Sequence, residues 1–132
     1  MSTIRDEKNK KISKGILDLV ANDYCIVNSR DLLTKARVTG NGSRELSEPR
    51  HILFYLVKKH TDMTYAEIKN NFHCVTGTSH IYKMVKDTEI TLRDKTKLEF
   101  YCQVKKIEKS VLQVVADWRR NLAIKIQEHD GQ

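Results

Sequence analysis

The chain has few of the residues that break helices or build disulfide frameworks. Its 132 residues include one proline, five glycines and three cysteines, and no two cysteines form a C-x-x-C motif. An odd number of cysteines without a regular spacing excludes a disulfide scaffold and is typical of a reducing cytosol. The scarcity of proline and glycine predicts a mostly helical fold in which long loops are rare.

Long apolar runs and nucleotide-binding signatures are also missing. No run approaches the ~20 apolar residues that a membrane-spanning helix needs. The N-terminal segment, MSTIRDEKNKKISK, is charged rather than apolar, so we expect no signal peptide. The absence of a G-x-x-x-x-G-K-S/T motif excludes a P-loop ATPase. Together these features predict a cytoplasmic protein with no membrane partner.

Positive charge is in excess and is unevenly distributed. The chain has 24 Lys and Arg residues against 17 Asp and Glu residues, a formal net charge of +7. Residues 49–86 hold only two acidic residues, against the basic residues Arg50, Lys58, Lys59, Lys69, Lys83 and Lys86. Concentrated positive charge favours a polyanionic partner such as nucleic acid, although an acidic protein surface or simple solubility also explains it.

The N-terminal region, residues 1–46, is predicted to contain two helices and a loop. An amphipathic helix is expected over residues 3–23, capped by Ser2 or Thr3. Its apolar stripe consists of Ile12, Ile16, Leu19 and Val20. A short second helix is expected to begin at Asn28 or Ser29, and the Gly-Asn-Gly cluster after it predicts a flexible loop.

Residues 47–90 are predicted to form the centre of the fold. Ser47-Glu48-Pro49 indicates a helix start, because serine can cap a helix and proline suits its first turn. The helix that follows, to His60, is apolar on nearly all sides, which is typical of a central helix. Thr64 and Glu67 form a capping box that starts the next helix. A third helix is expected to begin between Thr76 and Thr78.

The third helix has two chemically different sides. At 100° per residue, Ile81, Met84 and Val85 cluster on one side. The opposite side carries Ser79, Lys83 and Lys86, with Tyr82 beside them and Thr78 at the edge. We therefore expect the first set to pack inward and the second set to face solvent or a ligand.

The C-terminal region, residues 91–132, is predicted to be a long helix that Thr91 could cap. Its apolar residues recur about every 3.5 residues, the spacing of a coiled-coil seam. They are Leu98, Tyr101, Val104, Ile107, Val111, Val114, Trp118, Leu122 and Ile126. Two interpretations follow: one long helix, or two, that cross the core of this domain, which we favour, or a seam for self-association.

Two helices joined by a short turn, the second with a polar outer side, indicate a helix-turn-helix. In that motif the second helix enters the major groove with its N-terminal residues at the base edges. The hydroxyls of Thr78 and Ser79 suit base edges, and Lys83 and Lys86 suit phosphates. The helix that starts at Thr64 can also hold a phosphate through its free amides. The same pattern occurs in proteins that do not bind DNA.

A series of spaced residues in the stretch 49–86 carries a family resemblance. They are Pro49-Arg50, then Thr61, Thr64, Glu67-Ile68 and Phe72, and finally Thr78-Ser79 and Ile81. This series resembles, without gaps, the C-terminal DNA-binding domain of the bacterial replication initiator DnaA. The resemblance implies an all-α fold with a helix-turn-helix of the type shared by that domain and the Trp repressor.

The resemblance also implies roles for individual residues. Arg50 would contact a groove or the DNA backbone, Thr61 and Thr64 would lie on the phosphate side, Thr78 and Ser79 would meet base edges, and Lys86 would be a basic position of the recognition helix. Arg37 and Arg44 are rough counterparts of the basic loop of the family. Each role has a structural alternative: Arg50 pairs with Glu48 or Glu67, and Thr64 and Thr78 cap their helices.

The chain departs from the family at the turn before the recognition helix. The family has Gly-Gly-Arg-Asp-His-Thr-Thr, whereas residues 73–79 here are His-Cys-Val-Thr-Gly-Thr-Ser. Because the Arg, Asp and His readers are absent, we expect either another DNA sequence or mainly nonspecific binding. Thr76 and Tyr82 are additional residues that face bases in this hypothesis.

The sequence therefore predicts a noncatalytic protein that binds double-stranded DNA and acts in replication or its regulation in a bacterium, phage or mobile element. The alternative is an adaptor or inhibitor that binds a protein of a nucleic-acid machine. We expect no enzyme activity and no cofactor. We also expect no metal ion, because His73, Cys74 and His80 do not have a usual ligand spacing.

Overall fold

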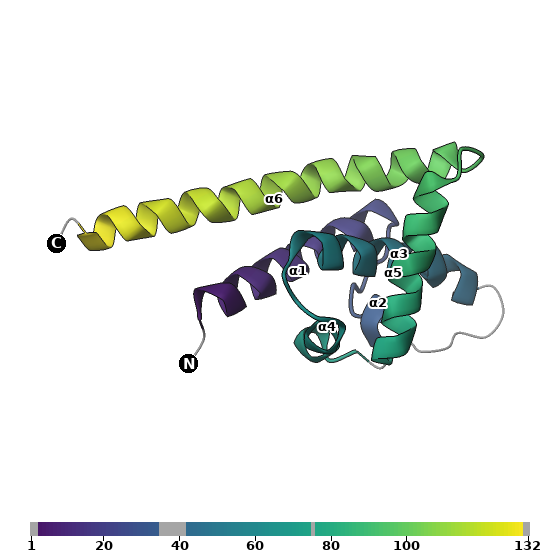
Figure 1. The fold of residues 1–132 in the computed structure, drawn as a ribbon, viewed down its shortest axis with the longest axis horizontal. Coiled ribbons are helices and arrows are strands. Elements are labelled where there is room, and N and C mark those ends of the chain that lie inside the picture. The colour runs from purple at the N-terminus through teal and green to yellow at the C-terminus, as the bar shows by residue number, and fades with distance from the viewer. Residues whose placement is uncertain (1–2, 35–41, 75, 131–132) are drawn as a thin grey trace.

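The computed structural model describes residues 3–34, 42–74 and 76–130 of the chain (Figure 1). Within these ranges every regular element is helical, which confirms the all-α class. The helices are α1 (Ile4–Asp23), α2 (Asp31–Thr34), α3 (Gly42–His60), α4 (Tyr65–Phe72), α5 (Thr78–Arg93) and α6 (Leu98–Asp130). None of the helices in the described ranges combines the length and the apolar character needed to cross a bilayer.

Helix α3 lies at the centre of the molecule and contacts α1, α2, α4 and α5. Its side chains are buried on several sides, as the apolar sequence predicts: Ile52, Leu53, Phe54, Leu56 and Val57 are all 0% exposed. Figure 1 shows α1 and α6 running in opposite directions along one side, and α5 standing across the far end. The central position of α3 therefore determines where the helices around it pack.

Helix α1 begins as the sequence predicts. Thr3 caps it, because its hydroxyl accepts a hydrogen bond from the Asp6 amide while the Asp6 carboxylate accepts one from the Thr3 amide. The predicted stripe residues Ile12, Ile16 and Val20 are fully buried. Leu19 is only half-buried, and Leu17 takes its place in the core.

The beginning of α3 differs from the prediction. We expected Ser47-Glu48-Pro49 to start the helix, but α3 begins at Gly42 and Pro49 lies inside it. Proline has no amide hydrogen, so the carbonyl four residues earlier loses its partner within the helix. The ring of Pro49 is buried, and its packing offsets this local cost. Of the expected loop and its two arginines, residues 35–41 and the side chain of Arg44 lie outside the described part of the structure.

The junction between α5 and α6 also differs from the prediction. Thr91 does not cap the C-terminal helix, because it lies within α5 and its hydroxyl donates to the Asp87 carbonyl at 2.8 Å. The chain turns instead at Asp94, whose carboxylate accepts from the amide and the hydroxyl of Thr96 at 2.9 and 2.7 Å. Helix α5 thus continues through Thr91 to Arg93, past the residue that was expected to start the C-terminal helix.

Helix α6 is a single helix, and its first half packs on the domain. Val104, Ile107 and Val111 are buried, and α6 contacts both α1 and α5. Ile124 and Ile126 near its end remain 46% and 50% exposed. Only some of the regularly spaced apolar residues of α6 therefore pack against the described part of the chain.

A buried carboxylate joins α6 to the end of α3. The Glu108 side chain is 8% exposed, and one of its oxygens accepts from Lys59 Nζ and from His60 Nε2, each at 2.7 Å. Lys105 Nζ donates to the other oxygen at 3.3 Å. Burial by itself would raise the pKa of Glu108, but the hydrogen bonds from Lys59 and His60 outweigh it and lower the pKa to about 2.

We expect Glu108→Gln to lower the free energy of unfolding at neutral pH by about 2–3 kcal/mol, because it removes the buried negative charge that accepts hydrogen bonds from Lys59, His60 and Lys105. The folded pKa lies below the unfolded value of about 4.3, so the contribution is complete above about pH 5 and is lost as the pH falls toward 2. Urea unfolding at several pH values measures this. Glu99→Gln, at an exposed glutamate of the same helix, is the control; equal losses in the two variants would contradict the assignment.

Candidate nucleic-acid interface

Helices α4 and α5, with the turn between them, have the order that a helix-turn-helix requires. Thr64 caps α4: its hydroxyl accepts from the Glu67 amide at 3.2 Å, and Glu67 Oε1 accepts from the Thr64 amide at 3.0 Å. This is the capping box that the sequence predicts. Helix α4 ends at Phe72, its C-cap His73 has φ 52°, and five residues, 73–77, separate α4 from α5.

Two cations hold the turn between α4 and α5. Lys69 Nζ donates to the carbonyls of Cys74 and Thr76 at 2.8 and 3.1 Å. Arg30 Nη1 donates to the Phe72 carbonyl at 3.1 Å. The Cys74 thiol is buried within this turn, and its burial raises its pKa. Lys69 therefore has a structural role, although the sequence analysis counted it among the basic residues of the stretch 49–86 that favour a polyanionic partner.

Helix α5 packs on α3 through the side that the helical spacing predicts. Ile81, Met84 and Val85 are at most 3% exposed. Ser79, Tyr82, Lys83 and Lys86 are exposed, and we call these four residues the α5 outer face. Helix α6 does not cover the two lysines. The prediction of which residues point inward and which point outward is therefore confirmed.

The N-terminus of α5 is open. Gly77 is the N-cap and offers no side-chain hydrogen bond, so the structural alternative in which Thr78 caps the helix does not apply. A β-carbon added at Gly77 would have no atom within 4 Å, and Ser79 and His80 in the first turn are exposed. Open amides at a helix N-terminus are suited to an anion such as a phosphate.

Aromatic rings and lysines form a continuous row that extends from the α5 outer face onto α4 and α3. The rings of Tyr65 and Tyr82 meet edge to face, with centroids 5.3 Å apart. Lys58 Nζ lies 4.9 Å from the centre of the Tyr65 ring, and Lys86 Nζ lies 5.5 Å from that of Tyr82. We call these four residues the Lys–Tyr row. The sequence did not indicate the row, because its members come from three different helices.

Arg50 lies in a structural bridge. Its guanidinium donates from Nε to the Leu32 carbonyl at 3.0 Å and from Nη2 to the Asp31 carbonyl at 3.2 Å. It is half-buried, and desolvation lowers its pKa. These bonds tie α3 to α2, whereas the alternatives we considered were pairs with Glu48 or Glu67. The predicted contact of Arg50 with DNA stays a prediction.

The start of α4 carries acidic groups. Arg5 of α1 reaches across and bonds the carboxylates of Asp62 and Glu67, each at 3.0 Å. The Arg5 guanidinium and the Thr64 amide hold the pKa of Glu67 at about 2. The hydroxyl of Thr61 donates to the Val57 carbonyl at 2.6 Å. A phosphate at this helix start would therefore meet two ionised carboxylates, and both predicted threonines already bond the chain itself.

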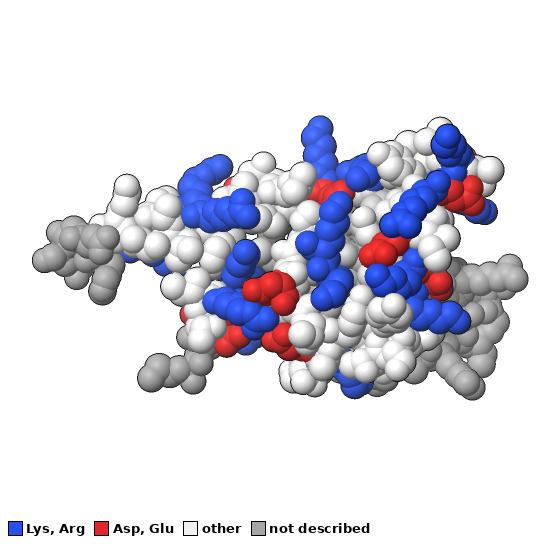
Figure 2. Space-filling model, in the orientation of Figure 1, with Lys and Arg blue, Asp and Glu red and all other residues white. Residues whose placement is uncertain are grey.

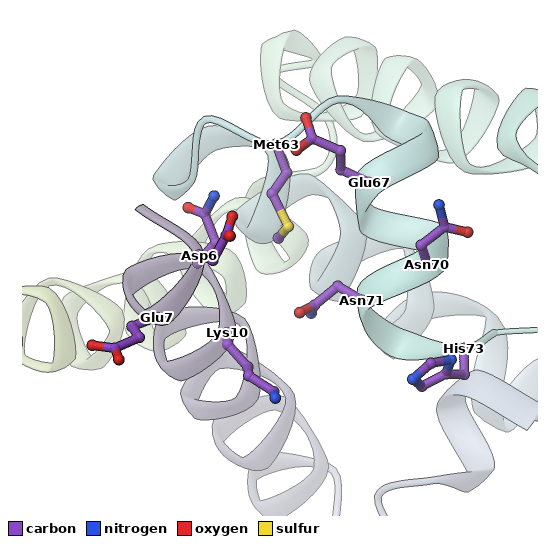
Figure 3. Close-up of a pocket in the computed structure, with 9 residues that line it drawn as sticks. Asp6, Glu7, Lys10, Met63, Glu67, Asn70, Asn71 and His73 are labelled. Carbon is purple, nitrogen blue, oxygen red and sulfur yellow. The ribbon is translucent and has the colours of Figure 1, made fainter. Parts of the chain in front are cut away.

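A pocket of about 400 Å³ separates α1 from α4 (Figure 3). Asp6, Glu7 and Lys10 line it from α1, and Glu67, Asn70 and Asn71 line it from α4. Asn71 Nδ2 donates to Ser13 Oγ at 2.8 Å, so the pocket wall is tied to α1. The lining mixes both signs of charge with carboxamides, and it lies away from the predicted DNA-facing residues of α5.

Charges of both signs are interspersed on the surface. Figure 2 shows Lys and Arg side chains spread over the displayed face, with Asp and Glu side chains beside many of them. The net positive charge of the chain therefore does not produce one wholly basic surface on this side. On the displayed side, attraction of a polyanion has to be local, at elements such as α5.

Neither a metal site among the described residues nor a matching protein indicates the function of the chain. Among the residues whose placement is described, no group of three or more His, Cys, Asp or Glu side chains is arranged to hold a metal ion. Comparison of the chain with models of protein families, with curated proteins and with solved structures found no match.

We expect Lys69→Ala to lower the free energy of unfolding by about 1–3 kcal/mol, because the carbonyls of Cys74 and Thr76 lose a charged donor. The amides of residues 74–80 should also exchange their hydrogens faster. Urea unfolding and hydrogen exchange measure the two effects. The control is Lys83→Ala, which removes the same charge from an exposed position on α5. Unchanged stability of Lys69→Ala would show that the turn does not depend on this lysine.

Proposed function

We propose that the chain is a noncatalytic protein that binds double-stranded DNA by placing the N-terminus of α5 in the major groove. The observation that carries the proposal is that α5 has one buried apolar side and one exposed polar side. Its inner side is part of the core, while Ser79, Tyr82, Lys83 and Lys86 on its outer side are exposed and polar. A helix held in this way can meet a groove without any rearrangement of the fold.

The first turn of α5 is the part that would approach the bases. Ser79 and Thr78 supply hydroxyls that can donate or accept at any base, and a threonine methyl can contact the thymine methyl. Thr76 lies just before α5, in the turn that joins it to α4, and Tyr82 lies one helical turn after Thr78. The open amides after Gly77 suit a phosphate at the groove edge. The relation to the DnaA domain and a role in replication or its regulation belong to the same proposal.

Three lysines would hold the DNA backbone. Lys83 and Lys86 lie on the α5 outer face. Lys58 Nζ donates one hydrogen to the Met63 carbonyl at 3.0 Å, which leaves its two other hydrogens for a phosphate. Arg50 is left out of this set because its guanidinium is used on the carbonyls of α2. With three phosphate contacts, the logarithm of the association constant should fall with the logarithm of the salt concentration at a slope of about −2.7.

We expect the double variant Lys83→Ala, Lys86→Ala to flatten this slope to about −0.9, because each phosphate contact contributes about −0.9. Fluorescence anisotropy with a labelled duplex over a salt series measures it. The matched control is Lys95→Ala, Lys97→Ala, which removes the same charge at the opposite end of α5, about 24 Å from Thr78. An equal change in both double variants would mean that only net charge matters, and binding that does not respond to salt would remove the proposal.

We expect Ser79→Ala to weaken binding to a duplex selected from a random library by about 1–3 kcal/mol, because one base-edge contact is lost. The same variant should bind an unrelated duplex as the unchanged protein does. Titrations of both duplexes at one salt concentration give the comparison. If the selection enriches no motif and Ser79→Ala has no effect, binding is nonspecific and only the backbone part of the proposal stands.

A second candidate is an adaptor or inhibitor that binds a protein of a nucleic-acid machine. The observation that favours it is the mixture of charges on the displayed surface, together with the exposed apolar residues at the end of α6. The salt series separates the two candidates. An adaptor of this kind shows no salt-dependent affinity for a duplex.

A further inference from the structure

The pocket between α1 and α4 has a negative end and a positive end. Figure 3 shows Asp6 and Glu67 near one end and Lys10 and His73 near the other, with Asn71 between the two ends. Asp6 and Lys10 are four residues apart on α1, so the two ends are separated by about 6 Å along the helix axis. With a volume of about 400 Å³, the pocket can take a small molecule that reaches from one end to the other.

The negative end has carboxylate charge that the chain does not balance. Three carboxylates lie within 4 Å of the Arg5 guanidinium, and they belong to Asp6, Asp62 and Glu67. One guanidinium against three carboxylates leaves two negative charges at this end. Lys8, from the same part of α1, is turned toward α6, where its Nζ lies 5.9 Å from the centre of the Trp118 ring. A positively charged ligand group is therefore favoured at the negative end.

Asn9 adds a hydrogen-bond acceptor without a partner to this pocket. It lines the pocket and is 4% exposed. Its Nδ2 donates to Asp62 Oδ1 at 2.8 Å, which fixes the orientation of the carboxamide, because the reverse orientation would place two acceptors together. Asn9 Oδ1 accepts no hydrogen bond from any described residue. A buried acceptor without a donor is unfavourable, so a ligand that donates here, such as an ammonium group, is stabilised.

The positive end consists of two side chains that the fold does not use. Lys10 and His73 are exposed, and neither side chain forms a hydrogen bond or an ion pair with another described residue. His73 also has φ 52°, at the C-cap of α4. Glycine adopts this conformation without strain and is the commonest residue at such helix ends. The fold by itself favours a glycine at position 73, whereas a ligand carboxylate beside Lys10 favours a histidine.

We propose that this pocket binds a small zwitterion. The ammonium group of the ligand lies at Asp6 and Asn9, and its carboxylate lies between the side chains of the positive end. The two charged groups are then about 6 Å apart, which is the spacing across a dipeptide or a five-carbon ω-amino acid. Met63 lines the pocket and is 3% exposed, so it offers apolar surface to the atoms between the charged groups. A ligand with charge of one sign would meet repulsion at one of the two ends.

NMR titration of the isotope-labelled chain without DNA tests the proposal with probes of nearly equal length. Glycylglycine and δ-aminovalerate are zwitterions, whereas cadaverine has two ammonium groups and glutarate two carboxylates. We expect a zwitterion to shift the amide signals of α1 and α4 with a Kd of ~1 mM or lower, and cadaverine and glutarate to bind at least ~10-fold more weakly. The tighter zwitterion identifies the source as a dipeptide or an ω-amino acid, and equal affinities mean that only the charged ends are recognised. No binding by either zwitterion, or equally tight binding of cadaverine or glutarate, would overturn the proposal.

Two variants show whether binding uses this pocket. Lys10→Gln should raise the Kd of the tighter zwitterion at least ~10-fold, because its carboxylate loses a charged donor. The matched control is Lys11→Gln, at an exposed lysine that lines a different pocket, between α1 and α6, and it should leave the Kd unchanged. His73→Gly should weaken binding without lowering the urea midpoint of unfolding, because glycine suits the backbone there.

An unchanged Kd in Lys10→Gln or His73→Gly, or an equal loss of affinity in Lys11→Gln, would place the ligand elsewhere and overturn the proposal. A lower urea midpoint of His73→Gly would show that the histidine serves the fold, which also contradicts the proposal. Because no DNA is present, these outcomes are independent of whether α5 binds a duplex.

Discussion

The burial of α3 on nearly all sides is the constraint from which the other positions follow. An apolar helix of this kind is stable in water only if neighbours enclose it, and α1, α2, α4 and α5 supply that enclosure. Helix α5 contributes Ile81, Met84 and Val85, so its opposite side is turned to solvent by the packing itself. The α5 outer face is therefore exposed because of the core, and any surface contact it makes uses a helix whose orientation is already fixed.

Most of the cations around the centre of the fold are used within the chain. Arg50 and Lys69 bind backbone carbonyls of α2 and of the turn, and Lys59 binds the buried Glu108. Such bonds are favourable because carbonyls at helix ends and turns otherwise lack donors. Fewer basic side chains are therefore available to a ligand than the composition suggests, and those that are lie on α5 and in the Lys–Tyr row.

Local rules predicted the local features of this fold, and non-local packing decided the rest. The cap at Thr3, the capping box at Thr64 and the inward side of α5 depend on residues three or four positions apart, which a sequence shows directly. The start of α3 at Gly42 could not be predicted in this way, because the burial of Pro49 outweighs the preference of proline for the first turn of a helix. At the candidate interface, the lysines and Ser79 were predictable from helical spacing. The Lys–Tyr row and the bridge at Arg50 join different helices, so no local pattern revealed them.

The close approach of Gly15 to Val114 limits what position 15 can be. Val114 is the midpoint of the 33 residues of α6, and the half before it is held in the core by Val104, Ile107 and Val111. Even the single methyl group of an alanine at position 15 would lie 3.0 Å from Val114 Cγ1, so the valine side chain or one of the two helices would have to shift. The absence of a side chain at one residue of α1 therefore sets the distance between the first and the last helix of the fold.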